Sequence, residues 1–342
     1  MSSESRHAWA ESGVEMVAPD VYRIPLPLPS DGLRAVNVYA ILDDGGVTLI
    51  DAGWALAEAK AELGRALKGL DREFGDIHEF FVTHAHRDHY TMAVEIRRLF
   101  GSAIAIGERE RQNLAYIKGV IDGTTEPSYL ARLRRGGARK LMDEAAASHR
   151  QQPTAELWEM PDRWLNNHAE LDVAGRKLRV LATPGHTSGH VVFQDAAAGL
   201  LFAGDHVLPH ITPSIGFQPA PYLGPLADYL DSLRLMLTLP DARLLPAHGP
   251  AGGSVHARVH ELLEHHERRL TETLEGIGET ATAYEVAQLI PWTRRELAFT
   301  ELSVFDQVLA VNETGAHLDV LVTRGQATSE QGEDEALVYR RR

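Results

Sequence analysis

The sequence predicts a mixed α/β fold built on a β-sandwich. Short β-rich runs alternate with helical stretches along much of the chain, as in mixed folds. Four of the β-rich runs end in loops that bear histidine or aspartate. A helical stretch over residues 108–168 interrupts the strand pattern, and helices return after Gly253.

The composition narrows the class of protein. The chain has 342 residues, 44% of them hydrophobic, which is enough for a sizeable core and more than one domain. The absence of cysteine excludes disulfides, Cys-ligated zinc, iron–sulfur clusters and a cysteine nucleophile. The net charge of −14 disfavours nucleic acid as a partner without excluding it. With no apolar signal region and no run of 18 apolar residues, we expect a cytoplasmic protein without a membrane span.

In the first part of the chain, β-rich runs predict strands, and leucines at helical spacing predict a helix. The turn Asp43-Asp44-Gly45-Gly46 lies between two such runs and predicts a hairpin. The predicted strands cover residues 21–28, 36–42, 47–50, 80–83 and 103–106, and the predicted helices cover residues 56–70 and 93–100.

The second part returns to strands after the helical stretch and then becomes helical. Pro240 ends one predicted helix, and Thr282 with Glu285 forms a capping box at the start of another. Residues 326–342 are polar without an apolar period, so we expect a mobile tail. The predicted strands cover residues 178–183, 191–193, 200–203 and 244–245, and the predicted helices cover residues 228–239, 259–274, 284–290, 305–311 and 317–324.

The densest polar cluster follows the strand that ends at Thr83. His84, His86, Asp88 and His89 fall within six positions, just before a helix. Imidazole and carboxylate are ligands that suit zinc, iron or manganese. We expect His84 and His86 to face one ion and Asp88 and His89 to face a second.

Three further loops repeat this form, because each places a potential ligand beside a glycine after an apolar run. They contribute His186, Asp205 and His248. An isolated histidine is usually a surface or capping residue. The cluster together with three matching loops instead indicates a metal site.

These motifs resemble those of the metallo-β-lactamase superfamily, whose fold is an αββα sandwich. The HxHxDH signature stands at residues 84–89, and the resemblance covers about residues 20–253. It implies one metal site at His84, His86 and His186, and a second at Asp88, His89 and His248, with Asp205 bridging. It therefore implies two divalent ions, with zinc favoured and iron or manganese as alternatives.

The resemblance also implies residues that support the ligands. Asp51 matches the superfamily's DxG motif near an early strand end, although a plain turn aspartate would look the same. His190 is expected to hydrogen bond near the site or simply to pack. His210 lies just beyond Asp205, and we expect either a substrate contact or a structural role.

The implied chemistry is hydrolysis. Two nearby cations lower the pKa of a shared water, and the resulting hydroxide attacks a carbonyl or phosphoryl centre. Asp88 is the local carboxylate best suited to orient that nucleophile or to pass its proton, so it is the predicted catalytic residue. No Gly-x-Ser-x-Gly elbow offers a serine alternative.

The filled ligand set resembles the glyoxalase II, lactonase and phosphodiesterase side of the superfamily. True β-lactamases commonly use a cysteine at the second metal, so antibiotic hydrolysis is disfavoured. We expect a small ester, thioester or lactone as substrate. A phosphodiesterase or ribonuclease is the alternative enzyme, and a binding or redox protein is a weaker one.

The expected organisation is an N-terminal tail over residues 1–19, a metallo-β-lactamase domain over 20–255, a C-terminal domain over 256–325 and a polar tail over 326–342. The C-terminal domain resembles the winged-helix-like extension of the branch that contains β-lactamase-like protein 2, some members of which cleave single-stranded RNA. We expect the insertion at 108–168 to form a lid over the metal cleft.

Five positive charges lie together between residues 132 and 140 of this insertion. We expect Arg134, Arg135 and Arg139 to contact the anionic part of a substrate such as a phosphate-bearing thioester. The alternative is a solvated helix face. Apolar helices at 229–239 and 259–274 also allow a homo-oligomer, although burial within the chain explains them equally well.

Overall fold

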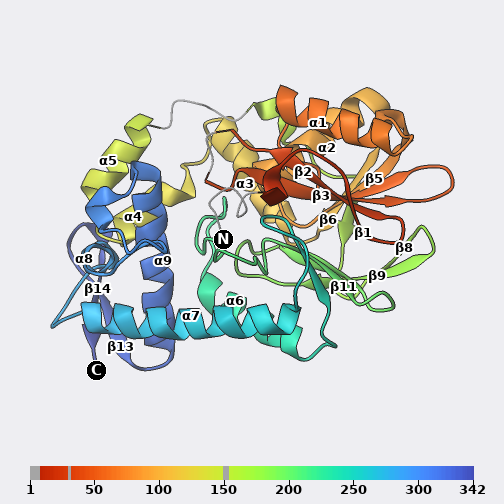
Figure 1. Ribbon diagram of the computed structural model, residues 1–342. Coiled ribbons are helices and arrows are strands. Elements are labelled where there is room, and N and C mark those ends of the chain that lie inside the picture. Colours follow the sequence, from red (N-terminus) through yellow and green to blue (C-terminus); the bar gives the residue numbers. More distant parts are fainter. Residues whose placement is uncertain (1–7, 30–31, 149–153) are drawn as a thin grey trace.

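The structure is a computed structural model that describes residues 8–29, 32–148 and 154–342. Two β-sheets pack face to face, and helices cover the outer face of each, which gives the order helix, sheet, sheet, helix (Figure 1). A separate group of helices and a small hairpin lies at one end of this sandwich (Figure 1). The predicted mixed α/β class and αββα layering are confirmed.

The first sheet has seven strands in the order β1-β2-β3-β4-β5-β6-β7. The strands from β1 to β4 are antiparallel neighbours, and those from β4 to β7 are parallel neighbours. Their bounds are β1 (Glu15–Ala18), β2 (Val21–Pro27), β3 (Ala35–Leu42), β4 (Val47–Ile50), β5 (Ile77–Val82), β6 (Ala103–Gly107) and β7 (Arg163–Leu165).

The second sheet has five strands in the order β12-β11-β10-β9-β8. Only the pair β11 and β12 is parallel. Their bounds are β8 (Glu170–Val173), β9 (Arg176–Ala182), β10 (Val191–Asp195), β11 (Leu200–Gly204) and β12 (Arg243–Pro246).

Three apolar clusters lie between the layers. One joins α1 (Ala57–Gly69) and α2 (Arg87–Phe100) to the first sheet. A second fills the space between the sheets, where Phe81 and Phe193 pack with ring centroids 5.9 Å apart. The third joins the second sheet to α6 (Pro225–Leu237) and α7 (Val255–Gly276) and continues into the C-terminal elements.

The insertion forms helices, as predicted, but two of these helices pack on the C-terminal elements. Helices α4 and α5 both contact α9 at the end of the molecule that lies away from the two sheets of the sandwich (Figure 1). The insertion contributes α3 (Glu110–Ile121), α4 (Ser128–Arg135) and α5 (Arg139–Ser148), and the C-terminal elements are α8 (Ala283–Leu289), α9 (Val304–Thr323), β13 (Ala327–Gln331) and β14 (Leu337–Arg341). Residues 149–153 of the expected lid lie outside the described residues.

The predicted tail at 326–342 is wrong, because these residues form the antiparallel pair of β13 and β14. Tyr339 is buried, and its backbone pairs with that of Ala281 ahead of α8. The hairpin is polar because one face is open to solvent, so its sequence resembles that of a tail. After α7, the chain continues through the isolated bridge at Ala281, helices α8 and α9, and this hairpin.

Three other expectations need correction. The expected N-terminal tail contains strand β1, which pairs with β2, while residues 1–7 of that tail are not described. Helix α2 begins at Arg87, six residues earlier than predicted, so Asp88 and His89 lie in its first turn. Helix α9 is continuous where two shorter helices were expected. Among the described residues, no helix is both long and apolar enough to cross a membrane.

Candidate metal centre

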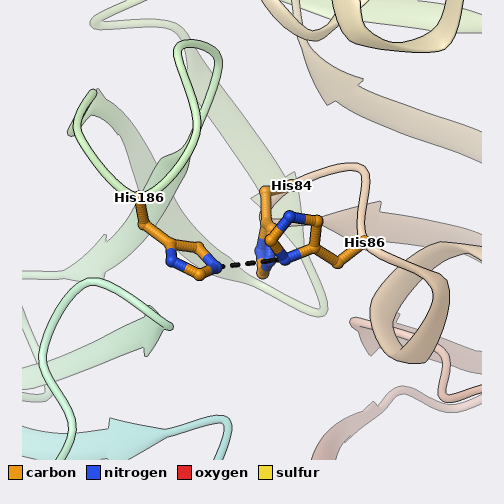
Figure 2. A group of neighbouring side chains, drawn as sticks. All are labelled: His84, His86 and His186. Carbon is orange, nitrogen blue, oxygen red and sulfur yellow. Dashed lines mark hydrogen bonds between the residues drawn. The ribbon is translucent and has the colours of Figure 1, made fainter. Parts of the chain in front are cut away.

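Three imidazoles from two loops converge at the edge of the sandwich. His84 and His86 lie between β5 and the start of α2, and His186 follows β9 (Figure 2). Nδ1 of His86 lies 2.9 Å from Nε2 of His84 and 3.1 Å from Nε2 of His186. Three nitrogens this close together could hold a single metal ion.

A second group lies beside the first and includes two carboxylates. Nε2 of His248 lies 3.5 Å from Oδ2 of Asp88 and 3.4 Å from Oδ1 of Asp205. Nε2 of His89 lies 3.8 Å and 3.7 Å from the same two oxygens. The other oxygen of Asp205, Oδ2, lies 3.4 Å from Nε2 of His186 in the first group. The carboxylate of Asp205 therefore faces both groups.

Hydrogen bonds at the outer nitrogens orient four of the imidazoles. Nδ1 of His84 contacts Thr83 Oγ1 at 3.1 Å, and Nδ1 of His89 contacts Asp51 Oδ2 at 2.9 Å. Nδ1 of His186 lies 2.8 Å from the carbonyl oxygen of Ser214, and Nδ1 of His248 lies 2.8 Å from that of Ala35. A proton on each Nδ1 leaves Nε2 free to bind a metal, which is how proteins usually hold histidine ligands.

The donor set fits divalent cations. The inner atoms His89 Nε2, His248 Nε2 and Asp205 Oδ1 are buried and have no hydrogen-bond partner among the described residues. Such orphaned atoms are costly unless something binds them. Nitrogen and carboxylate oxygen together are the ligands of zinc, iron and manganese.

The electrostatics of the centre also favour bound positive charge. Burial lowers the pKa of His84 well below its usual value, and neighbouring imidazoles lower it further, so His84 is a neutral ligand. Burial raises the pKa of Asp88, but His89 and His248 outweigh this effect and hold it well below the usual range. Burial alone would lower the pKa of His89. The carboxylates of Asp51, Asp88 and Asp205 raise it by more, so the pKa of His89 lies above its usual value. The carboxylates at this centre therefore attract a cation.

The structure brings both predicted supporting residues to the ligands. Asp51 directly follows β4 and has a positive φ of 61°, and its Oδ1 accepts hydrogen bonds from the Thr83 amide at 2.8 Å and hydroxyl at 3.0 Å. Nδ1 of His190 contacts Thr183 Oγ1 at 2.8 Å, and its Nε2 accepts a hydrogen bond from the Asp205 amide at 3.1 Å. His190 therefore positions the loop of Asp205.

Sequence reasoning missed a buried carboxylate beneath two of the ligand loops. Glu110 is fully buried in α3, accepts hydrogen bonds from Thr187 Oγ1 and from Asn113 Nδ2, and binds the backbone at Ala85 and Gly189. It thereby connects the loop of His86 to that of His186. No sequence signal marks this role, because a glutamate in the first turn of a helix is ordinary.

The loop of His248 has a similar support. The side-chain amide of Asn37 donates to the carbonyls of Pro246 at 2.9 Å and Gly249 at 2.8 Å, and Tyr39 Oη also donates to Pro246. Strand β3 thus holds the end of β12 across the sandwich. Asn37 lies within a β-rich run, where nothing in the sequence distinguishes it.

The other predicted substrate contacts are not among the residues gathered at the metal centre. His210 is exposed, near Arg258 and Arg294. Arg134 pairs with Glu126 at 3.1 Å, and Arg139 pairs with Asp334 at 3.0 Å. Arg135 Nη2 lies 2.6 Å from Asp319 Oδ1 in α9. Arg135 and Arg139 thus pair with the C-terminal elements, while Arg134 pairs within the insertion. A contact of these arginines with substrate stays a prediction.

Comparison with known proteins agrees with this architecture. A family model for the metallo-beta-lactamase superfamily matches residues 31–248, more than half of the chain. A probable metallo-hydrolase, YqjP of Bacillus subtilis, is 29% identical over 331 residues, covering 92% of this chain and 96% of its own. A β-lactamase-like protein 2 homolog of Caenorhabditis elegans is 29% identical over 147 residues, covering 41% of this chain and 47% of its own.

Solved structures show the same relationship over almost the whole chain. A metallo-β-lactamase family protein of Thermus thermophilus has a TM-score of 0.74 at 26% identity and covers 96% of this chain and 100% of its own. A β-lactamase domain protein of Burkholderia ambifaria has a TM-score of 0.78 at 26% identity and covers 97% of this chain and 95% of its own. The chain belongs to the metallo-β-lactamase superfamily, as a metallo-hydrolase with a His and Asp cluster suited to divalent cations.

Proposed function

We propose that the protein is a dinuclear metal-dependent hydrolase of a small ester, thioester or lactone, with zinc as the favoured metal. The observation that carries the proposal is the placement of Asp205. Its Oδ2 lies 3.4 Å from His186 Nε2, and its Oδ1 lies 3.4 Å from His248 Nε2. A carboxylate with one oxygen toward each ligand group supports a pair of cations that share it as a bridge.

The chain's residues divide into ligands and a proton acceptor. His84, His86 and His186 would hold one cation, and Asp88, His89 and His248 the other. Such a pair supplies a water of lowered pKa and a Lewis acid for the substrate oxygen. The side chain of Asp88 is 14% exposed against 9% for Asp205, so of these two carboxylates Asp88 is the more accessible from solvent. As a carboxylate within reach of solvent, Asp88 can orient the attacking water and accept its proton.

A phosphodiesterase or ribonuclease is the second candidate. The order of two helices and a hairpin after α7 favours it, because that order supports a winged-helix-like domain. Winged helices often bind nucleic acid, but residues 256–342 carry nine Lys or Arg against sixteen Asp or Glu. An acidic domain repels phosphates, because binding to a nucleic-acid backbone depends on positive charge. Because residues 256–342 are acidic, we rank a small ester, thioester or lactone above a nucleic acid as the substrate.

The test combines metal analysis with a substrate panel. Purified protein should contain about two divalent ions per chain by mass spectrometry and should hydrolyse a thioester or lactone faster than bis-p-nitrophenyl phosphate or single-stranded RNA. His86→Ala and Asp205→Asn should abolish turnover. His78→Ala is the matched control, because His78 is an exposed histidine in β5, the strand that precedes the loop of His86, and this variant should retain full activity.

Two outcomes would contradict the proposal. Cleavage of the diester or RNA without thioester or lactone turnover would promote the second candidate. Full activity of His86→Ala, or of protein shown to be metal-free, would refute metal-dependent hydrolysis altogether.

A further inference from the structure

The imidazoles of the metal centre differ in their access to solvent. His86 is half-buried, whereas the other four imidazoles of the centre are buried, namely those of His84, His89, His186 and His248. The side of His86 is therefore the side from which these imidazoles can be reached. A substrate that enters from solvent passes His86, so the side chains beside His86 influence which substrate binds.

Two phenylalanines lie on this accessible side, and we refer to them as the aromatic pair. The ring of Phe217 lies 6.1 Å from that of His86, and the ring of Phe305 lies 5.3 Å from that of Phe217, nearly perpendicular to it at 87°. Phe217 is half-buried, and Phe305 is 43% exposed. An apolar surface therefore continues from a candidate metal ligand out to solvent.

The loop that carries Phe217 is attached to the loop that carries His186. The carbonyl oxygen of Ser214 contacts Nδ1 of His186 at 2.8 Å, and Oε1 of Gln218 accepts a hydrogen bond from the Ser188 amide at 2.6 Å. These contacts lie on both sides of Phe217 in the sequence. The same loop therefore orients one imidazole of the centre and positions the first ring of the aromatic pair.

Phe305 is held in place by the start of α9. The hydroxyl of Ser303 accepts a hydrogen bond from the Asp306 amide at 3.2 Å and donates one to Oδ2 of Asp306 at 2.7 Å. The amide of Gln307 donates to the carbonyl oxygen of Leu302 at 3.2 Å. A single exposed apolar side chain is ordinary on a protein surface. Phe305 differs because its backbone is fixed and its ring packs on a second ring beside the metal centre.

The chemistry of two rings favours a third ring as their occupant. Aromatic groups attract one another through edge-to-face and offset contacts, beyond the gain from burying apolar area. We propose that the aromatic pair binds an aromatic ring carried by the acyl group of the substrate. The inference rests on the proposed hydrolase, because it names the substrate class of the same centre. The acyl group is the part that esters, thioesters and lactones have in common.

Calorimetric titration of the full-length, metal-loaded protein tests the aromatic pair without depending on turnover. The probe is 4-phenylbutyrate, an acid that hydrolysis of an aryl-bearing substrate would release. It is compared with 4-cyclohexylbutyrate, which has a saturated ring, and with butyrate, which has none. We expect 4-phenylbutyrate to bind about 2- to 10-fold more tightly than 4-cyclohexylbutyrate and at least about 10-fold more tightly than butyrate.

The variants assign this preference to the aromatic pair. Phe305→Ala should weaken 4-phenylbutyrate at least about 5-fold and leave butyrate unchanged. Phe217→Leu keeps an apolar side chain without a ring, so it should reduce the preference for phenyl over cyclohexyl. Phe100→Ala is the matched control, because Phe100 is also exposed and stacks on Phe74 at 5.5 Å, but lies at the last residue of α2. It should bind all three acids like the wild type.

Three results would overturn the inference: 4-cyclohexylbutyrate binding as tightly as 4-phenylbutyrate, butyrate binding as tightly as 4-phenylbutyrate, or a phenyl preference that Phe305→Ala and Phe217→Leu both retain in full. The hydrolase is judged separately by turnover. Equal hydrolysis of butyryl and 4-phenylbutyryl thioesters would overturn the aromatic subsite and leave the hydrolase standing. Failure to hydrolyse any ester, thioester or lactone would refute the hydrolase, whichever acids bind.

Discussion

Replacing Asp51 by asparagine should weaken metal binding although Asp51 is not itself a ligand. The two side chains have nearly the same shape, but the amide has one acceptor atom where the carboxylate has two. Asp51 Oδ2 lies 2.9 Å from His89 Nδ1, and Oδ1 accepts from the Thr83 amide at 2.8 Å. An asparagine can satisfy only one of these two donors.

Either orientation of the new amide has a cost. If its nitrogen faces His89, the imidazole must move its proton to Nε2, the atom that faces Asp88 and Asp205. If its nitrogen faces Thr83, a buried backbone amide loses its acceptor. An unsatisfied buried group costs about 1–3 kcal/mol, or roughly 5- to 150-fold in a binding constant. We expect the second cation to bind about 10- to 100-fold more weakly, the range typical of residues that orient metal ligands.

The assay is equilibrium dialysis against chelator-buffered zinc, with bound metal counted by mass spectrometry. Asp43→Asn is the matched control, because Asp43 accepts hydrogen bonds from Gly45 and Gly46 in the β3–β4 turn, far in the sequence from any ligand loop. The reasoning is refuted if Asp51→Asn is folded and binds both ions at the same free zinc concentration as the wild type.

Three further substitutions test the packing and the titration of buried groups. Gly185→Ala would place a Cβ 2.5 Å from the Cα of Tyr229, so it should lower the free energy of unfolding by about 3 kcal/mol or more. Gly69→Ala is the control, because a Cβ there meets no atom within 4 Å and should leave that free energy unchanged. Equal unfolding midpoints of the two variants in urea would contradict this prediction. Burial raises the pKa of Glu313 from 4.5 to about 7, so the folded state binds the extra proton and stability falls as pH rises between these values. Glu313→Gln should therefore stabilise the protein by about 1–3 kcal/mol at pH 8 and less at pH 5, and a pH-independent difference in thermal midpoint would rule this out. Thr282→Ala should cost about 0.5–2 kcal/mol in chemical unfolding by removing the capping box of α8, and an unchanged midpoint would count against that cap.

The sequence predicted the strands and loops of the metal centre because their signals are local. His84, His86 and His89 lie in one short motif, and a glycine marks each of the loops that carry His186 and His248. A residue's position at a strand end determines where its side chain lies, so a one-dimensional pattern was enough to predict that these groups meet.

The rest depends on partners that are remote in sequence. Arg135 looks like a free cation until α9 brings Asp319 to it from 184 positions away. The hairpin at 326–342 has a polar sequence, and its strand pairing and the burial of Ala327 and Tyr339 become visible only in the fold. Glu110 likewise gains its role from two loops that only the fold brings together. No periodicity or spacing encodes such contacts.

The ligand loops come from both halves of the sandwich, since His84 follows a strand of the first sheet and His186 follows a strand of the second. An ion bound between them would bind only the folded protein, because the unfolded chain does not bring these ligands together. A free divalent ion at 100 times its dissociation constant would then add about 2.7 kcal/mol to the free energy of unfolding. The thermal midpoint of the protein would therefore rise with the concentration of the ion that it binds.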